Sequence, residues 1–185
     1  MKSMIKTACL LATGILFQTS LVQASDSKSK DLEILSKLLK DQAVVSKHIE
    51  KMDEMDFVIF NGQQWHRIKE SHSKDVLVHW PDGRTTTGID VHIEDMKAMF
   101  VWSPDLEITK HPVKFGAGSW TAVIGEMTGT FTLPMPIGEG KTIPPTGKSF
   151  KIAMTTIGNW ENGVMTEEFL FWDNQEFMNQ IGLGQ

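Results

Sequence analysis

Residues 150–172, "FKIAMTTIGNWENGVMTEEFLFW", decide the fold. Two runs rich in β-branched and aromatic residues, Phe150–Trp160 and Val164–Trp172, flank Glu-Asn-Gly, a strong signal for a tight hairpin turn. The second run is apolar on both faces when its side chains alternate along a strand. A strand of this kind usually has helices on one side of its sheet and another subunit on the other. We therefore expect a hairpin in a sheet that packs on helices and forms a homodimer through its other face.

Working outward from this hairpin, the chain divides into helices followed by strands. Apolar residues recur at helical spacing from Lys30 to Asn61-Gly62, and the pattern allows one break. The other predicted helices are a short one at Trp65–Glu70, one that a capping box starts at Thr87 and Pro104 ends, and a short one at Asn174–Ile181. The other predicted strands run from Asp75 into a Pro-Asp-Gly turn, from Leu106 to Phe115, and from Trp120 to Phe131.

This order of elements predicts an α+β fold, with a curved antiparallel sheet packed on N-terminal helices. Leu133–Lys148 contains four of the seven prolines and cannot be a central strand. We expect it to be a long loop, and loops of this length are often functional.

The first 24 residues are typical of an export signal. They carry two lysines, an apolar stretch from Ala8 to Phe17, and a small-x-Ala pattern that ends at Ala24. The predicted organisation is a signal peptide over residues 1–24, a helical extension over 25–46 and the main domain over 47–185. The one cysteine, Cys9, falls in the signal, and an exported domain without disulfides fits the bacterial periplasm. We expect a periplasmic or secreted protein that is not membrane-bound after signal removal.

The charge of the chain argues against nucleic-acid binding. The net charge is −5 at pH 7, and Arg67 and Arg84 are the two arginines of the sequence. A protein that follows a phosphate backbone carries a basic surface instead.

Asp173 is the first candidate for chemistry, because it ends an apolar strand beside Trp172. Burial among aromatic residues would raise the pKa of an Asp carboxyl and make it useful as an acid/base group near neutral pH. Asp173 also opens a capping box with Glu176, which indicates a helix N-cap. Both interpretations stay open at this point.

Histidines next to tryptophans form the second group of candidates. His66 follows Trp65, and His79 precedes Trp80. Such a histidine at a pocket mouth can polarise a carbonyl or relay a proton, although solvent-exposed and core-filling roles are more frequent. His66, His72 and His79 are too irregularly spaced for a helical zinc pair and lack a nearby cysteine. We expect neither a metal nor another cofactor.

Four segments in order resemble the SnoaL-like polyketide cyclases, also called ester cyclases. These segments are "DGRTTTGIDVHIEDMK" (82–97), "GEMTGTF" (125–131), "PPTGKSFKI" (144–152) and "ENGVMTEEFLFWDNQEFMNQIGL" (161–183). The resemblance runs from about Lys47 to Leu183. It implies the cone-shaped α+β fold of nuclear transport factor 2 and ketosteroid isomerase, in which a curved sheet and helices enclose one apolar pocket.

The resemblance also implies a chemistry. Well-studied members close a ring by intramolecular aldol condensation without a metal or cofactor, and their acid/base aspartate corresponds to Asp173. Met127 and Asn159 stand where members of the family have histidines. We expect Asp173, His79 and His66 to be catalytic, and the substrate to be bound by six further residues, Trp65, Trp80, Glu126, Met127, Asn159 and Trp172.

Two functions follow as hypotheses. The first is a cofactor-independent cyclase or isomerase that acts on a small carbonyl compound. The second is a non-catalytic periplasmic protein that binds an apolar or aromatic small molecule in the same pocket. The export signal and the two replaced histidines favour the second hypothesis.

Overall fold

The computed structural model describes the backbone of residues 2–184 and the side chains of residues 27–184. The predicted export signal, residues 1–24, lies outside the described side chains, so export stays a prediction. The chain divides into two units, Met1–Gln42 and Ala43–Gln185. In the part of the chain whose side chains are described, no helix is long and apolar enough to cross a membrane.

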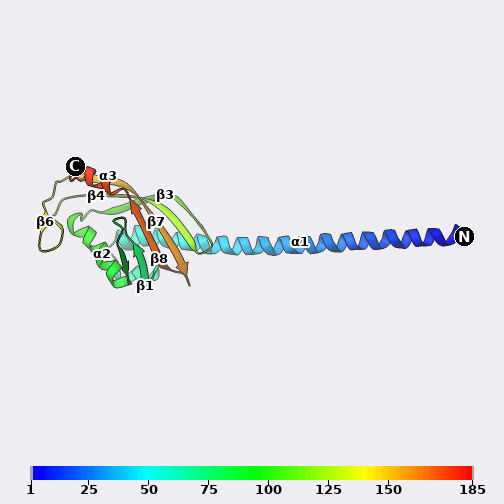
Figure 1. The fold of residues 1–185 in the computed structure, drawn as a ribbon. Coiled ribbons are helices and arrows are strands. Elements are labelled where there is room, and N and C mark those ends of the chain that lie inside the picture. Colours follow the sequence, from blue (N-terminus) through cyan, green and yellow to red (C-terminus); the bar gives the residue numbers. More distant parts are fainter. Residues whose placement is uncertain (1, 185) are drawn as a thin grey trace. The chain divides into compact units, whose positions relative to one another are not determined.

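Helices dominate the first half of the chain and strands the second (Figure 1). The helical elements are α1 (Lys2–Glu54), the π-helix η1 (Met55–Phe60), the 3-10 helix η2 (Trp65–Glu70), α2 (Ile89–Trp102) and α3 (Asn174–Gln180). The strands are β1 (His72–His79), β2 (Thr85–Thr87), β3 (Glu107–Ala117), β4 (Trp120–Thr130), β5 (Met135–Pro136), β6 (Thr142–Ile143), β7 (Ser149–Glu161) and β8 (Val164–Trp172).

Six strands form the main sheet in the order β2-β1-β8-β7-β4-β3. The predicted hairpin is β7–β8, and its turn residues Asn162 and Gly163 have φ angles of 51° and 80°. Such positive angles are what a tight hairpin turn requires, and Asn and Gly tolerate them best. The sheet is antiparallel except that β1 pairs with β8 in parallel. The α+β architecture with a curved sheet is therefore confirmed.

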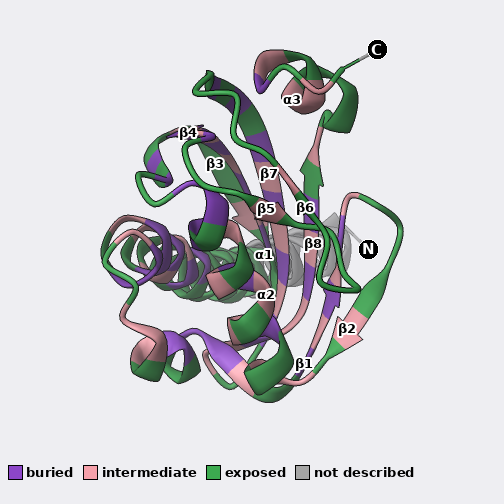
Figure 2. Cartoon of the chain, turned by 90° about the vertical axis from the view of Figure 1, so that its left-hand side faces the viewer, coloured by how far each residue is buried: buried purple, intermediate pink, exposed green. Residues whose placement is uncertain are grey.

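The central strands β4, β7 and β8 present one face to the helices and one face outward. In β4 the buried residues are Thr121, Val123, Gly125, Met127 and Gly129, and their neighbours are partly exposed. Figure 2 shows this alternation along the strands and α2 lying over the sheet. Helix α2 contacts β1 and β2, η1 contacts β3, and α3 contacts β7.

The core lies between these helices and the inner face of the sheet. Its members are aliphatic, aromatic and methionine side chains, among them Ile59, Phe60, Ile68, Val76, Val78, Met96, Phe100, Ile108, Met127, Phe131, Phe150 and Ile181. A smaller cluster of Met52, Val123, Trp160 and Met165 joins the end of α1 to the sheet, and His48 stacks on Trp160.

The structure corrects the predicted start of α2 and adds one element to a predicted loop. Thr87 was expected to cap α2, but it belongs to β2 and pairs with Leu77, so Gly88 is the N-cap, without a side-chain hydrogen bond. Gly88 has a φ of 103°, which only glycine adopts readily, and this explains why the helix starts there. The proline-rich segment 133–148 is largely a loop, as predicted, but it also contains the short β5–β6 ribbon.

Candidate functional site

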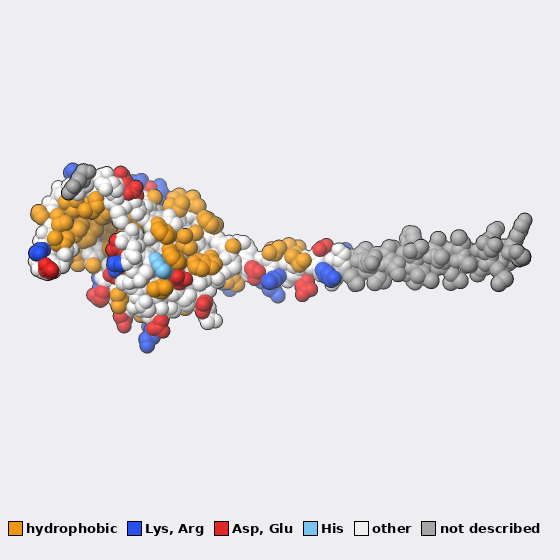
Figure 3. Space-filling view, in the orientation of Figure 1, with side chains coloured by type: hydrophobic (Ala, Val, Ile, Leu, Met, Phe, Trp, Pro, Cys, Tyr) orange, Lys and Arg blue, Asp and Glu red, His pale blue; other side chains and the backbone are white. Residues whose placement is uncertain are grey.

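A cavity of about 240 Å³ lies at one end of the second unit, between α2, α3 and the ends of β1 and β8. Its lining is mostly aromatic, aliphatic and thioether, with some polar residues at its edge. Figure 3 shows apolar side chains around a hollow at this end. A smaller cavity of about 40 Å³ shares four lining residues with it, Trp80, Met99, Met127 and Trp172, and continues toward the core.

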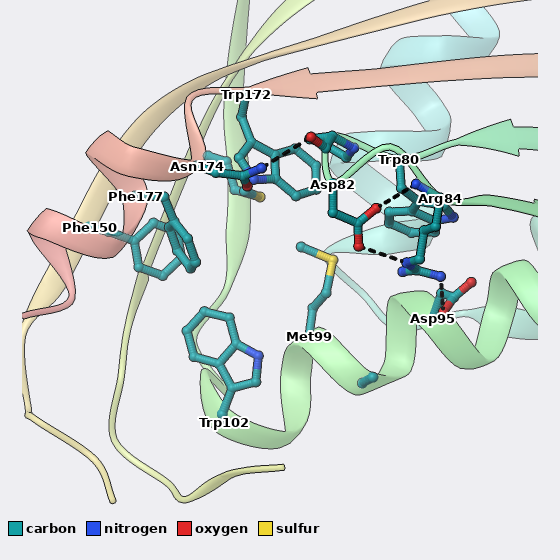
Figure 4. Close-up of a pocket in the computed structure, with 13 residues that line it drawn as sticks. Trp80, Asp82, Arg84, Asp95, Met99, Trp102, Phe150, Trp172, Asn174 and Phe177 are labelled. Carbon is teal, nitrogen blue, oxygen red and sulfur yellow. Dashed lines mark hydrogen bonds and ion pairs between the residues drawn. The ribbon is translucent and has the colours of Figure 1, made fainter. Parts of the chain in front are cut away.

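Strand ends and one helix face place the walls of the larger cavity. Trp80 follows β1, Trp172 ends β8, and these two strands are hydrogen-bonded neighbours. Met99 and Trp102 come from α2, and Phe177 comes from α3 on the other side (Figure 4). Because tryptophan and phenylalanine present flat apolar surfaces and methionine adapts its shape, such walls suit an apolar or aromatic ligand.

Arg84 stands at the mouth of the cavity. Its guanidinium carbon lies 4.4 Å from the centroid of the Trp80 ring, a cation–π contact. It also pairs with Asp82 at 3.1 Å and with Asp95 at 3.0 Å, as Figure 4 shows. Asn174 Nδ2 donates to the carbonyl oxygen of Pro81 at 3.1 Å and joins α3 to the turn after β1.

The smaller cavity at the inner end is mostly apolar, but three buried polar side chains are part of its lining. Asp56, His92 and Glu168 line it, and each is only 1–2 % exposed. Burial raises the pKa of the Asp56 carboxyl, against the opposing effect of a hydrogen bond from His111. Burial lowers the pKa of His92 to about 4. Burial also opposes ionisation of Glu168, but the nearby His72 and His92 outweigh it and lower the pKa of that carboxyl.

A chain of polar groups leads from Asp56 to the surface. His111 Nε2 lies 2.8 Å from Asp56 Oδ2, and His111 Nδ1 lies 2.8 Å from Asp53 Oδ1. Lys114 Nζ pairs with the other oxygen of Asp53. A neutral imidazole has one N–H, so both hydrogen bonds of His111 donate only when the ring is protonated. Although burial opposes it, the two carboxylates raise the pKa of His111 and favour that cation.

Three residues predicted from the sequence line the cavity: Trp80, Met127 and Trp172. Three others lie on the outer face of the sheet. His79 Nε2 pairs with Glu167 at 2.9 Å and its ring stacks on Phe169, whereas Glu126 pairs with Lys110 and Lys151. Asn159 lies opposite Glu167 on the neighbouring strand.

The remaining predicted residues also lie outside the cavity lining. His66 is exposed on η2, and Trp65 packs its ring edge-on against Phe60 and Phe100. Asp173 is the N-cap of α3, and its Oδ1 accepts from the backbone N–H of Glu176 at 2.9 Å. The N-cap interpretation is therefore confirmed. The catalytic roles of Asp173, His79 and His66 stay predictions.

The polar residues at the inner end were not predicted from the sequence, although each carries a local signal. Asp56 lies four residues after Met52 and four before Phe60, so it falls on the apolar face of its helix. His92 lies three residues after Ile89 and four before Met96, and it falls on the apolar face of its helix too. Glu168 and Leu170 both point to the buried face of β8. A polar residue on the apolar face of its element is the signal that identifies all three.

Comparison with known proteins agrees with this architecture. The model of the SnoaL-like polyketide cyclase family matches residues 51–181. A protein from Jannaschia sp. CCS1, described as SnoaL-like polyketide cyclase, is 19% identical; the match covers 77% of this chain and 96% of that one, with a TM-score of 0.66.

Two other solved structures are similar. IdmH from Streptomyces antibioticus, described as a polyketide cyclase, is 19% identical over 73% of this chain and 98% of its own, with a TM-score of 0.62. A protein with a ketosteroid isomerase-like fold from Catenulispora acidiphila, in complex with trimethylamine, is 14% identical over 68% of this chain and 87% of its own, with a TM-score of 0.55. No curated protein matches the sequence. Because the family model covers more than half of the chain, the protein belongs to the SnoaL-like polyketide cyclase family.

Proposed function

We propose that the protein is a cyclase or isomerase that acts on a small carbonyl compound, with Asp56 as its acid/base group. One observation carries this proposal: an apolar cavity with aromatic walls ends on a buried carboxyl whose pKa is raised by burial. An acid/base group is most effective when its pKa lies near the working pH. Ketosteroid isomerase also uses an Asp general base, next to a second carboxyl group whose pKa is raised by an apolar site.

The walls favour a substrate with an aromatic or extended apolar part. Trp102, Phe150 and Phe177 face the outer cavity, and its polar groups gather at the mouth around Arg84 (Figure 4). The apolar part would lie between these rings, with the reacting carbonyl group directed toward Asp56. A polar substituent left at the mouth would meet the guanidinium group.

The proposed reaction is a pair of proton transfers. Asp56 takes a proton from the carbon next to the carbonyl group, and the electron pair of that C–H bond moves into an enolate. In a cyclisation, the enolate carbon attacks a second carbonyl carbon and the protonated Asp56 returns its proton to the resulting alkoxide. In an isomerisation, the proton returns to a different carbon. Each path leaves Asp56 in its starting state.

His111 supports this role as a positioning residue. Its hydrogen bond holds one Asp56 oxygen, Oδ2, and fixes the orientation of the carboxyl group. The other histidine nitrogen is held by Asp53, so the ring cannot turn without breaking both bonds. Fixed orientation of an acid/base group keeps it close to the reacting carbon.

The first proton transfer can be tested with simple ketones. The purified protein is incubated in D₂O with a panel of small aryl ketones such as 2-tetralone, and exchange at the carbon next to the carbonyl is followed by NMR. We expect Asp56→Asn to lower the exchange rate by about 10²- to 10⁴-fold, the usual contribution of an acid/base group.

Asp75→Asn is the matched control, because Asp75 is exposed on β1 and does not line the cavity. It should exchange the ketones at the wild-type rate. Circular dichroism should show that both variants are folded. Exchange by no ketone of the panel, or equal rates for wild type and Asp56→Asn, would refute the proposed role of Asp56.

A further inference from the structure

Three buried polar side chains from three elements meet beside the smaller cavity, which two of them, His92 and Glu168, also line. His72 starts β1, His92 lies in the first half of α2, and Glu168 lies in β8. Their side chains are 0%, 3% and 1% exposed. One nitrogen of each histidine and one carboxylate oxygen lie within 4.8 Å of one another. Such a cluster is costly to bury unless its charges and lone pairs are satisfied.

Hydrogen bonds around His72 indicate which nitrogen carries the proton when its ring is neutral. The hydroxyl of Ser71 donates to the carbonyl oxygen of Ile68 at 3.1 Å, and Ser71 Oγ lies 2.9 Å from His72 Nδ1. Since the Ser71 proton is already used, His72 Nδ1–H is the donor to Ser71. In the neutral ring, Nε2 then carries a lone pair, and it faces Glu168 Oε2 at 3.7 Å.

The second histidine faces the same carboxylate oxygen, but its Nδ1 is not held by a hydrogen bond. His92 Nε2 lies 3.3 Å from the same oxygen, Glu168 Oε2. Both distances exceed the usual 2.7–3.2 Å of an N–H···O hydrogen bond. Among the described residues, His72 Nε2, both nitrogens of His92 and Glu168 Oε2 have no hydrogen-bond partner. Buried polar atoms without partners are rare, and an ion or a water molecule held between them is one explanation.

We propose that His72, His92 and Glu168 bind one divalent transition-metal ion. Ligands about 2.0–2.2 Å from a tetrahedral zinc ion lie roughly 3.3–3.6 Å from one another, close to the two distances observed. Two imidazoles and one carboxylate form a common catalytic ligand set for Zn²⁺ and Fe²⁺. The Ser71 hydrogen bond supplies the outer-shell contact that orients a ligating histidine.

Three protein ligands leave a coordination position open to the cavity. His92 and Glu168 also line the inner cavity beside Asp56, so a bound carbonyl oxygen could take that position. The ion would then polarise the carbonyl group while Asp56 moves the proton. This role rests on the proposed function, but binding of the ion does not, because it depends only on the three ligands.

A metal site was not expected from the sequence, which led us to predict that no metal is bound. That expectation compared the spacing of His66, His72 and His79, and only one of these belongs to the cluster. His92 and Glu168 join His72 because β1 lies next to β8 and α2 packs on β1. Ligands so far apart along the chain leave no spacing motif.

Metal binding by the full chain tests the proposal without any substrate. The protein is stripped with a chelator, dialysed and titrated with Zn²⁺ and separately with Co²⁺, using equilibrium dialysis with metal analysis for both ions and visible absorption for Co²⁺. We expect one equivalent per chain and a Co²⁺ spectrum typical of four or five ligands. Loss of an outer-shell contact typically lowers metal affinity by about 10- to 100-fold. Glu168→Gln removes a ligand itself, so it should weaken binding by at least about 100-fold.

Glu167→Gln is the matched control, since Glu167 is the neighbouring residue on the opposite face of β8 and pairs with His79. It should bind the ion as the wild type does, and His72→Gln should lose it as Glu168→Gln does. Failure of the wild type to bind either ion, or equal loss in Glu167→Gln, would overturn the proposal. Asp56→Asn should keep the ion, so failure of the metal site and failure of the acid/base role can be told apart.

Discussion

Asp173 and Trp172 are neighbours in the sequence with different surroundings. Trp172 lines both cavities, whereas Asp173 is exposed and caps α3. Alternation along β8 explains the difference, because Glu168, Leu170 and Trp172 share the inner face and Asp173 follows on the outer one. The carboxyl group of Asp173 is therefore directed to the helix end and away from the candidate site.

Asparagine at this position separates the capping role from a catalytic one. Asparagine caps a helix about as well as aspartate, so Asp173→Asn should leave the free energy of unfolding nearly unchanged. Asp173→Ala should lower it by about 1 kcal/mol. Because Asp173 does not line the cavity, we expect ketone exchange to continue in both variants. Urea unfolding and NMR exchange measure the two effects, and loss of exchange in Asp173→Asn would restore the catalytic role expected from the sequence.

At the scale of elements, the contact between η1 and β3 positions Asp56, the proposed acid/base group. Asp56 lies in the π-helix η1, and π-helical turns often occur at functional sites. His111 on β3 is held between Asp53 and Asp56, and the ring of Phe57 packs against it. This arrangement links a helix to a strand through a cation between two carboxylates. Its strength should depend on pH.

His111→Gln should lower stability by about 3 kcal/mol, because a buried Asp56 carboxylate would lose its cationic partner. The pKa of His111 is raised above its ordinary value of 6.5. The folded protein therefore binds more protons than the unfolded one between pH 6.5 and the raised pKa. This contribution is fully present below pH 6.5 and is lost as the pH rises through the raised pKa. Chemical unfolding of wild type should show that decline, and His111→Gln should not.

His66→Gln is the control for this experiment, because it also replaces a histidine but at an exposed position on η2. It should keep the wild-type dependence of stability on pH above 6.5. An unchanged dependence in His111→Gln would show that the imidazolium between Asp53 and Asp56 does not contribute to folding.

At the scale of the whole molecule, local sequence patterns predicted most helices and strands but not which of them lie next to each other. The β7–β8 hairpin, β3, β4 and α3 follow from alternation, Asn-Gly and a capping box within short windows. The parallel pairing of β1 with β8 joins residues about 90 positions apart, and no local pattern encodes it. The candidate site depends on this pairing, so its polar residues could be recognised singly but not as a group.

The predicted homodimer can be tested on the outer face of the sheet. Three aromatic residues on this face are exposed: Phe115 (63%), Trp120 (41%) and Phe171 (51%). A single exposed apolar residue needs no explanation, but several on one face indicate an interaction surface. We propose that a second copy covers them. Phe171→Glu should then convert a dimer to a monomer in sedimentation velocity, because a buried unpaired charge opposes association. Val101→Glu, which changes an exposed residue of α2, should stay dimeric. A monomeric wild type at micromolar concentration would contradict this arrangement.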